Sequence, residues 1–329
     1  MTKATSFPNI VCPVDRLPLT TASAQDKLVC RQGHEYRIDR GIPRFGAWES
    51  NYADAFGEQW QHYRVTQLDS YTRTDISRDR LKRCLGEALW QSLHKPGRIE
   101  VLEAGCGAGR FTEILLQQPG AAVTSTDLSS AVEPNQVNCP QSDRHRIIQC
   151  DINAMPFAPE QYDIVLCLGV VQHTKDPEKT ISDLYAQVRP SGWLVIDHYA
   201  HSLSAYTRIG DFLCRPLLKR LSPGRGLAAT RALTRWLFPI HRALRNTRPL
   251  QVVWSRVSPL LTYFHALPEL SDELQYEWAE LDTHDSLTDW YKRLRSPRSI
   301  RSTLEALRGQ NIWVARGGNG IEARCQKPT

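Results

Sequence analysis

Short apolar runs alternate with longer amphipathic stretches between residues 98 and 200. The apolar runs predict strands at 99–103, 121–126, 146–150, 162–168 and 193–198, with helical stretches between them. Strands that alternate with helices are typical of a parallel sheet covered by helices on both faces. Because ligands of such sheets bind outside the carboxyl ends of the strands, the residues just after each strand are the first site candidates.

The C-terminal region, residues 284–329, predicts a helix and a hairpin. A helical stretch covers about 299–307, and two apolar runs follow at 311–315 and 321–325. Glycine and asparagine between those runs, at 317–320, favour a tight hairpin turn. We therefore expect an antiparallel hairpin to complete the sheet.

Helical periodicity dominates residues 47–97. Phe56, Trp60 and Tyr63 recur at spacings of four and three, which places them on one helical face. A second helix is expected from Ser77 to Leu93, where leucines recur every fourth residue before a Pro-Gly pair ends the pattern. The segment is therefore expected to be largely helical.

Residues 201–283 separate the fifth strand from the C-terminal region. The stretch 230–244 is amphipathic, with leucines, Trp236 and Ile240 on one face and arginines mainly on the other. We expect this insertion to lie above the carboxyl edge of the sheet and to help select the substrate. The stretch 282–292 is rich in titratable groups and predicts a turn. We expect this turn to lead the chain back toward the carboxyl edge of the sheet, where the site candidates lie.

Composition and charge narrow the functional classes. The chain has 329 residues, of which 41% are hydrophobic and 23% are charged, an ordinary composition for a soluble globular protein. No run of about 18 apolar residues predicts a membrane span. The N-terminus lacks the apolar core of a signal peptide. Nine scattered cysteines then indicate reduced thiols in a cytoplasmic protein.

The net charge of +6 is unevenly distributed. Between His201 and Arg256, eleven Lys or Arg residues face a single acid, Asp211, which leaves about −4 for the rest of the chain. The excess favours an anionic partner: RNA, a phosphorylated or carboxylated small molecule, a carrier protein or a lipid surface. The alternative is that these arginines only solvate amphipathic helices.

A glycine-rich loop follows the first strand of the core. Glu103 precedes glycines at three alternate positions, Gly105, Gly107 and Gly109. A dinucleotide site would need glycine where Arg110 stands. The pattern Glu-x-Gly-x-Gly-x-Gly resembles motif I of the class I S-adenosylmethionine (SAM)-dependent methyltransferases. The resemblance implies a Rossmann-like core whose loop and Glu103 bind SAM, with NAD binding as the competing interpretation. It also implies that the helical segment 47–97 lies over the SAM pocket as a lid.

The ends of the next strands supply further cofactor candidates. Asp127, followed by Leu128, can accept both hydroxyls of a ribose, although it could instead cap the next helix. The resemblance assigns Asp151 to the adenine amino group and Ile152 to the ring. Leu168 ends the fourth strand. The run after it resembles methyltransferases of the ubiquinone-biosynthesis type, and the absence of an Asn/Asp-Pro-Pro-Tyr signature disfavours methylation of nucleobase amines.

Methyl transfer needs a base only when the acceptor must lose a proton, and histidine suits neutral pH. His198 at the end of the fifth strand, His284 and His173 are the candidates, with Asp282 or Asp285 as orienting partners. A histidine that only shapes its loop is the alternative for His173.

The N-terminal residues 1–46 contain a possible metal-binding pattern in two halves. Cys12 and Asp15 form the first half, and Cys30 and His34 form the second. The segment resembles the zinc ribbon that precedes the ribosomal RNA guanine-N1 methyltransferase domain, with Asp15 in place of a cysteine. The four residues could ligate Zn²⁺, or packing alone could hold a metal-free ribbon.

Together these patterns predict an α/β protein. Its core is a Rossmann-like, seven-stranded, mostly parallel sheet with a closing antiparallel hairpin, preceded by a zinc-ribbon-like module and interrupted by a helical insertion. The boundaries are 1–46, 47–97, 98–200, 201–283 and 284–329. The predicted activity is SAM-dependent methylation of a small molecule at oxygen, nitrogen or carbon. An RNA methyltransferase and a non-catalytic SAM- or zinc-binding module are the alternatives; the acceptor and the oligomeric state stay open.

Overall fold

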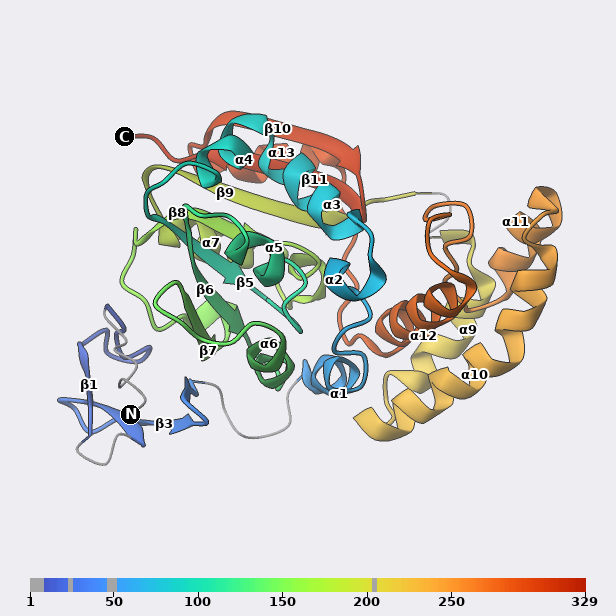
Figure 1. The fold of residues 1–329 in the computed structure, drawn as a ribbon, viewed down its shortest axis with the longest axis horizontal. Coiled ribbons are helices and arrows are strands. Elements are labelled where there is room, and N and C mark those ends of the chain that lie inside the picture. The colour runs from blue at the N-terminus through green and yellow to red at the C-terminus, as the bar shows by residue number, and fades with distance from the viewer. Residues whose placement is uncertain (1–8, 23–25, 46–51, 203–205) are drawn as a thin grey trace.

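The computed structural model describes residues 9–22, 26–45, 52–202 and 206–329. The predicted boundary between residues 46 and 47 lies outside these ranges. Within them a mixed sheet of seven strands forms the centre of the molecule (Figure 1). Its strands are β5 (Ile99–Ala104), β6 (Ala121–Asp127), β7 (His145–Gln149), β8 (Tyr162–Cys167), β9 (Val188–Tyr199), β10 (Gln310–Gly317) and β11 (Gly320–Gln326).

The strand order is β10-β11-β9-β8-β5-β6-β7. Pairs among β5 to β9 are parallel, whereas β11 runs antiparallel to both β9 and β10. The predicted strands and the closing hairpin are thereby confirmed. Because β5 has β6 on one side and β8 on the other, the connections diverge there and leave a crevice at the carboxyl ends of β5 and β8.

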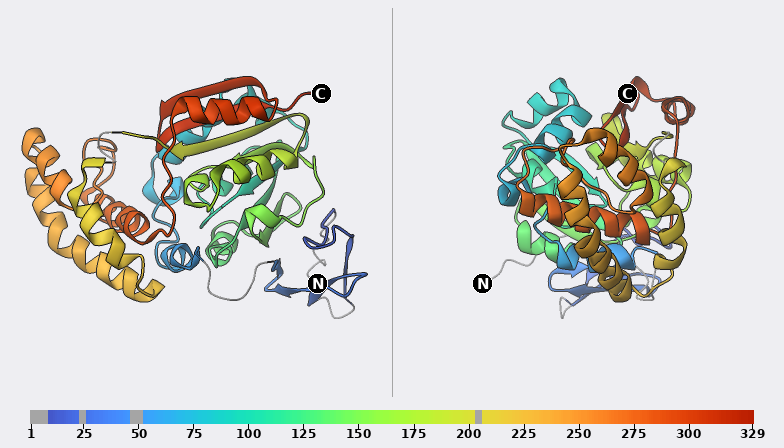
Figure 2. Two further views of the ribbon diagram at one scale, coloured as in Figure 1. Left: turned by 180° about the vertical axis from the view of Figure 1, so that it is seen from behind. Right: turned by 90° about the vertical axis from the view of Figure 1, so that its right-hand side faces the viewer.

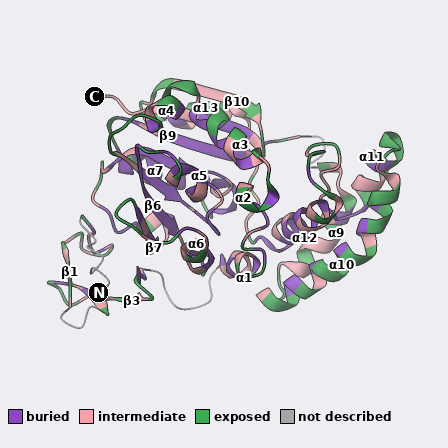
Figure 3. Cartoon of the chain, viewed as in Figure 1, coloured by how far each residue is buried: buried purple, intermediate pink, exposed green. Residues whose placement is uncertain are grey.

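Helices cover both faces of the sheet (Figure 2). On one face, α7 (Pro177–Gln187) and α13 (Pro297–Ala306) pack Leu184 and Leu304 into the core. On the other, α3 (Ile76–Leu85), α4 (Glu87–Leu93) and α5 (Thr112–Leu116) supply Leu81, Leu93 and Ile114. The sheet is accordingly the most buried part of the chain (Figure 3).

The single helix expected from Ser77 to Leu93 is two helices. Gly86, with φ +75°, separates α3 from α4. This positive φ, combined with ψ 162°, ends the first helix because glycine alone adopts it without steric cost. The break lets Leu85 and Trp90 reach the same core cluster from different helices.

A small antiparallel sheet forms the N-terminal module, made of β1 (Leu19–Thr21), β2 (Lys27–Cys30), β3 (Glu35–Asp39) and β4 (Ile42–Pro43). The module adjoins the β7 edge of the large sheet, next to α6 (Val132–Asn138). Arg44, only 3% exposed, donates hydrogen bonds to Gln149 Oε1 at 2.9 Å and Glu133 Oε1 at 2.8 Å. The Phe45 amide also bonds to the Gln149 carbonyl at 2.7 Å.

Helices of the insertion gather at the opposite end of the molecule (Figures 1 and 2). They are α9 (Ile209–Leu218), α10 (Pro223–Leu244), α11 (Arg248–Val257) and α12 (Asp272–Thr288), and the helices α1 (Asp54–His62) and α2 (Asp69–Thr72) lie between them and the sheet. Tyr63, Leu227 and Leu281 form a small core that joins α10 and α12 to the segment after α1. Within the described ranges no helix combines the length and apolar character needed to cross a bilayer.

The expected turn over 282–292 begins later than predicted. Helix α12 continues through Thr288, and the chain leaves the helix at Asp289. Its weak amphipathicity hid it in the sequence, because α12 is buried on several sides and so carries no continuous apolar stripe.

Candidate functional site

A cavity of about 1260 Å³ lies at the carboxyl edge of the sheet, between the core and the helices α1, α9 and α12. The core lines it with residues that follow β5, β6 and β8, together with Ile152 of the short helix η1 (Ile152–Ala154). Ligand pockets commonly measure roughly 300–1,000 Å³. The cavity therefore has room for a nucleoside cofactor and a second small molecule.

The glycine loop forms the floor of this cavity. Gly105, Gly107 and Gly109 have φ of +78°, +51° and +100°, a region that side chains other than glycine rarely occupy. A Cβ atom on Gly105 would lie 2.3 Å from Val170 Cγ2, and one on Gly107 would lie 3.1 Å from the Trp60 ring. The alternating glycines thus allow the loop after β8 and the helix α1 to approach the backbone.

Asp127, at the end of β6, fixes the position of this loop. Its Oδ2 accepts a 3.0 Å hydrogen bond from the Gly107 amide, and its Oδ1 accepts bonds from the amide and hydroxyl of Ser129. Burial raises the pKa of Asp127. Asp127 and Leu128 line the cavity beside Ile152 and Leu168. A carboxylate with apolar side chains beside it is suited to a nucleoside, because the carboxylate can accept the ribose hydroxyls and the apolar side chains can contact the base.

The predicted cofactor residues divide into two groups. Six of them line the cavity: Gly105, Gly107, Asp127, Leu128, Ile152 and Leu168. The other three, Glu103, Gly109 and Asp151, support the wall. A Cβ atom on Gly109 would lie 3.2 Å from Cys139 Sγ, and Asp151 caps η1 by accepting a 2.8 Å bond from the Asn153 amide.

Glu103 lies beneath the loop in a buried polar network. Its Oε2 accepts hydrogen bonds from Thr112 Oγ1 at 2.5 Å and from Ser125 Oγ at 3.2 Å. Burial raises the pKa of Glu103 to about 7, against the lowering effect of these two hydroxyls. In this arrangement Glu103 ties β5 to α5 and β6.

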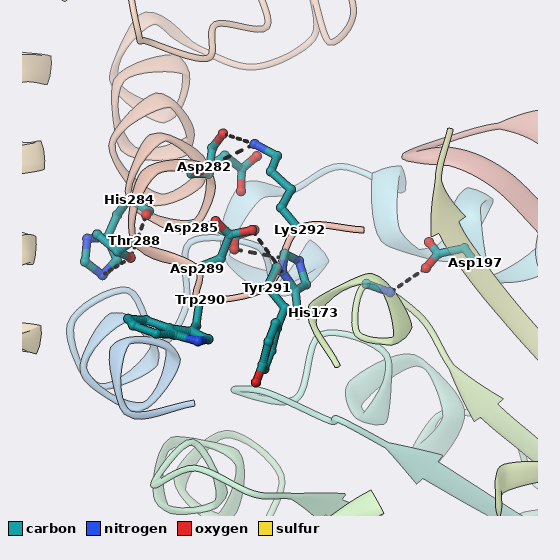
Figure 4. A network of polar contacts seen from close by, with 12 residues as sticks. His173, Asp197, Asp282, His284, Asp285, Thr288, Asp289, Trp290, Tyr291 and Lys292 are labelled. Atoms are coloured by element: carbon teal, nitrogen blue, oxygen red, sulfur yellow. Dashed lines mark hydrogen bonds and ion pairs between the residues drawn. The ribbon is translucent and has the colours of Figure 1, made fainter. Parts of the chain in front are cut away.

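His173 is the predicted base that lines the cavity. It ends the short helix η2 (Val171–His173), and the rings of Phe56 and Tyr199 pack edge-on against it. Its Nδ1 lies 3.2 Å from Asp289 Oδ2, and its Nε2 lies 3.9 Å from Asp285 Oδ1 (Figure 4). Burial opposes the charged imidazolium, but the two carboxylates prevail and raise the pKa of His173.

The surroundings of Nδ1 assign the tautomer of His173. Besides Asp289, the Tyr291 carbonyl lies 3.1 Å from the same nitrogen. Two acceptors at Nδ1 require a proton there, so in neutral His173 the lone pair lies on Nε2. Asp285 is itself partly buried, and its pKa rises to about 6 because burial and Asp289 outweigh the favourable charge of His173.

The structure places the other two predicted histidines away from the cavity. His198 neighbours Tyr199 in β9 and, because adjacent residues of a strand point to opposite faces, it faces away from the cavity that Tyr199 lines. His284 is fully buried, with Nδ1 3.0 Å from Thr230 Oγ1 and Nε2 3.4 Å from Thr288 Oγ1. Figure 4 shows it turned away from His173.

Sequence reasoning missed several charged residues of the cavity. Arg80 pairs with Asp197, whose Oδ1 accepts a 2.6 Å bond from the Gly169 amide. Arg110 is partly buried, with its guanidinium 5.4 Å from the centre of the Phe111 ring and 5.3 Å from that of Trp278, and burial, with the nearby Arg80, lowers its pKa to about 10. Both arginines line the cavity. No local motif marks them, because their partners lie far away in the chain.

The four predicted metal ligands converge in the N-terminal module. Ligand atoms of Cys12, Asp15, Cys30 and His34 all lie within 4.8 Å of one another. His34 Nδ1 is 3.5 Å from Cys12 Sγ, 3.3 Å from Cys30 Sγ and 3.0 Å from Asp15 Oδ2. Tetrahedral Zn²⁺, with bonds of about 2.0–2.3 Å, needs ligand atoms roughly 3.3–3.8 Å apart, so small shifts of these side chains would fit the set to a zinc ion.

The sequence is similar to those of known methyltransferases. Residues 102–196 match the family described as the methyltransferase domain. The ubiquinone biosynthesis O-methyltransferase of Leptothrix cholodnii is 32% identical over 110 residues, which cover 32% of this chain and 46% of that protein. The enzyme of the same name from Coxiella burnetii is 31% identical over 108 residues, with the same two coverages. The chain thus spans about half the length of these relatives.

A solved SAM-dependent methyltransferase from Methanosarcina mazei aligns with 73% of this chain and 97% of its own, with 11% identity and a TM-score of 0.42. Residues 102–196 of this chain therefore match a methyltransferase domain, and the order of the strands and the glycine loop agree with that match.

Proposed function

We propose that this chain is an enzyme that transfers a methyl group from SAM to a small molecule bound in the cavity. The observation that carries the proposal is the position of His173. It lines the same cavity as Asp127 and the glycine loop, and two carboxylates flank it. The cavity thus places a proton acceptor beside the residues proposed to bind the nucleoside.

The chain's residues fit SAM in three places. Asp127 would accept the ribose hydroxyls, and Leu128, Ile152 and Leu168 would enclose the ring. Arg80 lies in the cavity wall, and its Nε has no hydrogen-bond partner within the described ranges, which suits the carboxylate of the amino-acid part. When bound, SAM supplies a methyl group that its sulfonium has already activated.

His173 then acts on the acceptor. In its neutral form, Nε2 removes the proton from an acceptor hydroxyl or amine as that atom attacks the methyl carbon. The Tyr291 carbonyl accepts the Nδ1 hydrogen bond and holds the ring, and the carboxylates of Asp285 and Asp289 stabilise the imidazolium that forms. The rings of Phe56 and Tyr199 exclude water from the histidine.

A small acceptor agrees with the position of the cavity beneath the helices α1, α9 and α12. The test is incubation of the purified chain with methyl-labelled SAM and a fractionated cell extract. We expect label in the organic or small-solute fraction, and its loss in His173→Gln but not in His198→Gln. Label in nuclease-sensitive material would instead identify an RNA methyltransferase. SAM binding without any transfer would favour the non-catalytic module.

We further propose that Cys12, Asp15, Cys30 and His34 bind Zn²⁺. The Tyr36 hydroxyl lies 3.0 Å from Cys12 Sγ and would orient that ligand from outside the metal. The ion would join the loop before β1 to the β2–β3 turn, so its role is structural. It lies in the N-terminal module, at the opposite end from the helical insertion (Figure 1).

A further inference from the structure

Helix α9 has its polar face inside and its apolar face outside. Toward the protein, Arg215 bonds to Asp289, the Lys219 ammonium lies 5.2 Å from the centre of the Trp290 ring, and Asp211 pairs with Lys292. The outer face carries Ile209, Phe212, Leu213 and Leu217, which are 54%, 79%, 63% and 70% exposed.

Most surface helices show the opposite arrangement, because burial of the apolar stripe is what attaches a helix to the protein. The four outer side chains of α9 recur at helical spacing, so they form one continuous stripe. Isolated exposed apolar residues are normal, but a contiguous stripe of large ones marks an interaction surface.

Neighbouring helices extend this apolar surface. Helix α11 contacts α9 and exposes Leu250, Val253 and Val257 at spacings of three and four residues. On the other side, the surface meets the entrance of the cavity, since Tyr206, Phe212 and Pro216 line it and are exposed. We call the exposed faces of α9 and α11 the α9–α11 surface.

Exposed arginines lie at the ends of the helices next to this apolar surface. Residues 201–256 carry eleven Lys or Arg and one acid, and five of the arginines pair with acids: Arg208, Arg215, Arg231, Arg242 and Arg245. Arg220 follows α9, Arg225 lies in the first turn of α10, Arg248 begins α11, and all three are exposed. None of the three makes an ion pair with an acidic group in the described part of the chain.

We propose that the α9–α11 surface docks onto an anionic phospholipid bilayer. A bilayer interface offers an apolar layer for Phe212 and Leu213 and anionic headgroups for the arginines in one place. RNA would match the charge but would leave the apolar stripe in water. A second copy of the chain would bring two strongly basic surfaces together.

Docking would place the entrance of the cavity at the interface. Phe212 belongs both to the stripe and to the cavity lining, so an amphipathic acceptor could pass from the bilayer without crossing water. This last step rests on the proposed methyl transfer. The docking itself does not.

Co-sedimentation with lipid vesicles tests the docking. We expect the full chain to bind vesicles of phosphatidylcholine and phosphatidylserine, and to bind pure phosphatidylcholine much more weakly. Phe212→Ser combined with Leu213→Ser should weaken binding about tenfold or more. Val137→Ser is the matched control, because Val137 is 60% exposed on α6, away from this surface.

Arg220→Gln with Arg225→Gln should reduce binding to the anionic vesicles, whereas Arg301→Gln on the distant α13 should not. Thermal unfolding and SAM affinity of every variant, measured in parallel, separate lost docking from lost folding. The proposal fails if the wild-type chain ignores anionic vesicles, or if the Phe212/Leu213 variant binds them normally. It also fails if these residues instead mediate a stable dimer or RNA binding without vesicle binding.

Discussion

Arg215 Nε donates a 2.8 Å hydrogen bond to Asp289 Oδ1, while the other carboxylate oxygen of Asp289 lies 3.2 Å from His173 Nδ1. Arg215 also bonds to the Asp289 carbonyl at 2.8 Å. Asp289 is 1% exposed, so these contacts form out of water, where charge interactions are strong. The insertion helix α9 thereby positions the proposed base of the core.

Asp289→Asn should move the pH dependence of methyl transfer. The base must be neutral, so kcat/KM should rise as pH passes upward through the pKa of His173. Asp285 and Asp289 raise that pKa against the effect of burial. Loss of one carboxylate should therefore lower it, so the rise should occur at lower pH, and kcat should fall about 10- to 100-fold because the imidazolium is less stabilised. Asp272→Asn is the control and should leave the pH profile unchanged. If Asp289→Asn also leaves the low-pH side of the kcat/KM profile unchanged, the role of His173 as the base is contradicted.

Arg215→Gln should weaken catalysis without weakening SAM binding. Arg215 touches Asp289 rather than the reacting atoms, so it is a positioning residue. We expect kcat to fall about tenfold, with a changed acid limb of the pH profile and an unchanged Kd for SAM. Arg301→Gln should change none of these quantities. A purely structural role would lower thermal stability but leave the shape of the pH profile intact.

Asp127→Ala should weaken SAM binding. The substitution removes the proposed acceptor of the ribose hydroxyls and the bond from the Gly107 amide. Two hydrogen bonds to a charged group are worth about 1.5–3 kcal/mol each, so the Kd should rise by at least about tenfold. Isothermal titration calorimetry measures it, with Asp143→Ala, on an exposed turn, as the control. Equal affinity in both variants would exclude Asp127 from the cofactor site.

Cys30→Ser should abolish zinc binding by the N-terminal module. The purified wild-type chain should contain one equivalent of zinc by elemental analysis, and Cys214→Ser should retain it because Cys214 lies on α9. Chelators should lower the melting temperature of the wild-type chain but have little effect on Cys30→Ser, since structural zinc contributes to folding. A wild-type chain that neither contains zinc nor takes it up on titration would show that packing alone holds the module.

His284 should make folding stability depend on pH. Burial lowers its pKa from 6.5 to about 4, so between these values the unfolded chain binds more protons than the folded one. Its contribution is full above pH 6.5 and is lost as pH falls toward 4, by at most roughly 3 kcal/mol. Urea unfolding at pH 7 and pH 5 should show this decrease, and His284→Gln should reduce it. The exposed His94→Gln should not, and identical pH dependence in both variants would refute the effect.

Local patterns in the sequence sufficed for the core. The strands ending at Ala104, Asp127 and Cys167 follow from short apolar runs, and the alternating glycines mark the sharp turn after β5. Each of these features involves neighbours in the chain, so local chemistry determines it. The spacing of Cys12, Asp15, Cys30 and His34 likewise predicted a cluster that the fold of the module assembles.

Long-range packing decided the rest. His173, His198 and His284 are equivalent as sequence candidates, and they differ only in which face of a strand or helix each occupies. His173 gained its carboxylate partners because α12 runs on to Thr288 and delivers Asp289 to the core, where Arg215 holds it. Asp289 lies 116 positions after His173 and 74 positions after Arg215 in the sequence. No local pattern encodes such pairs, because tertiary packing alone brings them within hydrogen-bonding distance.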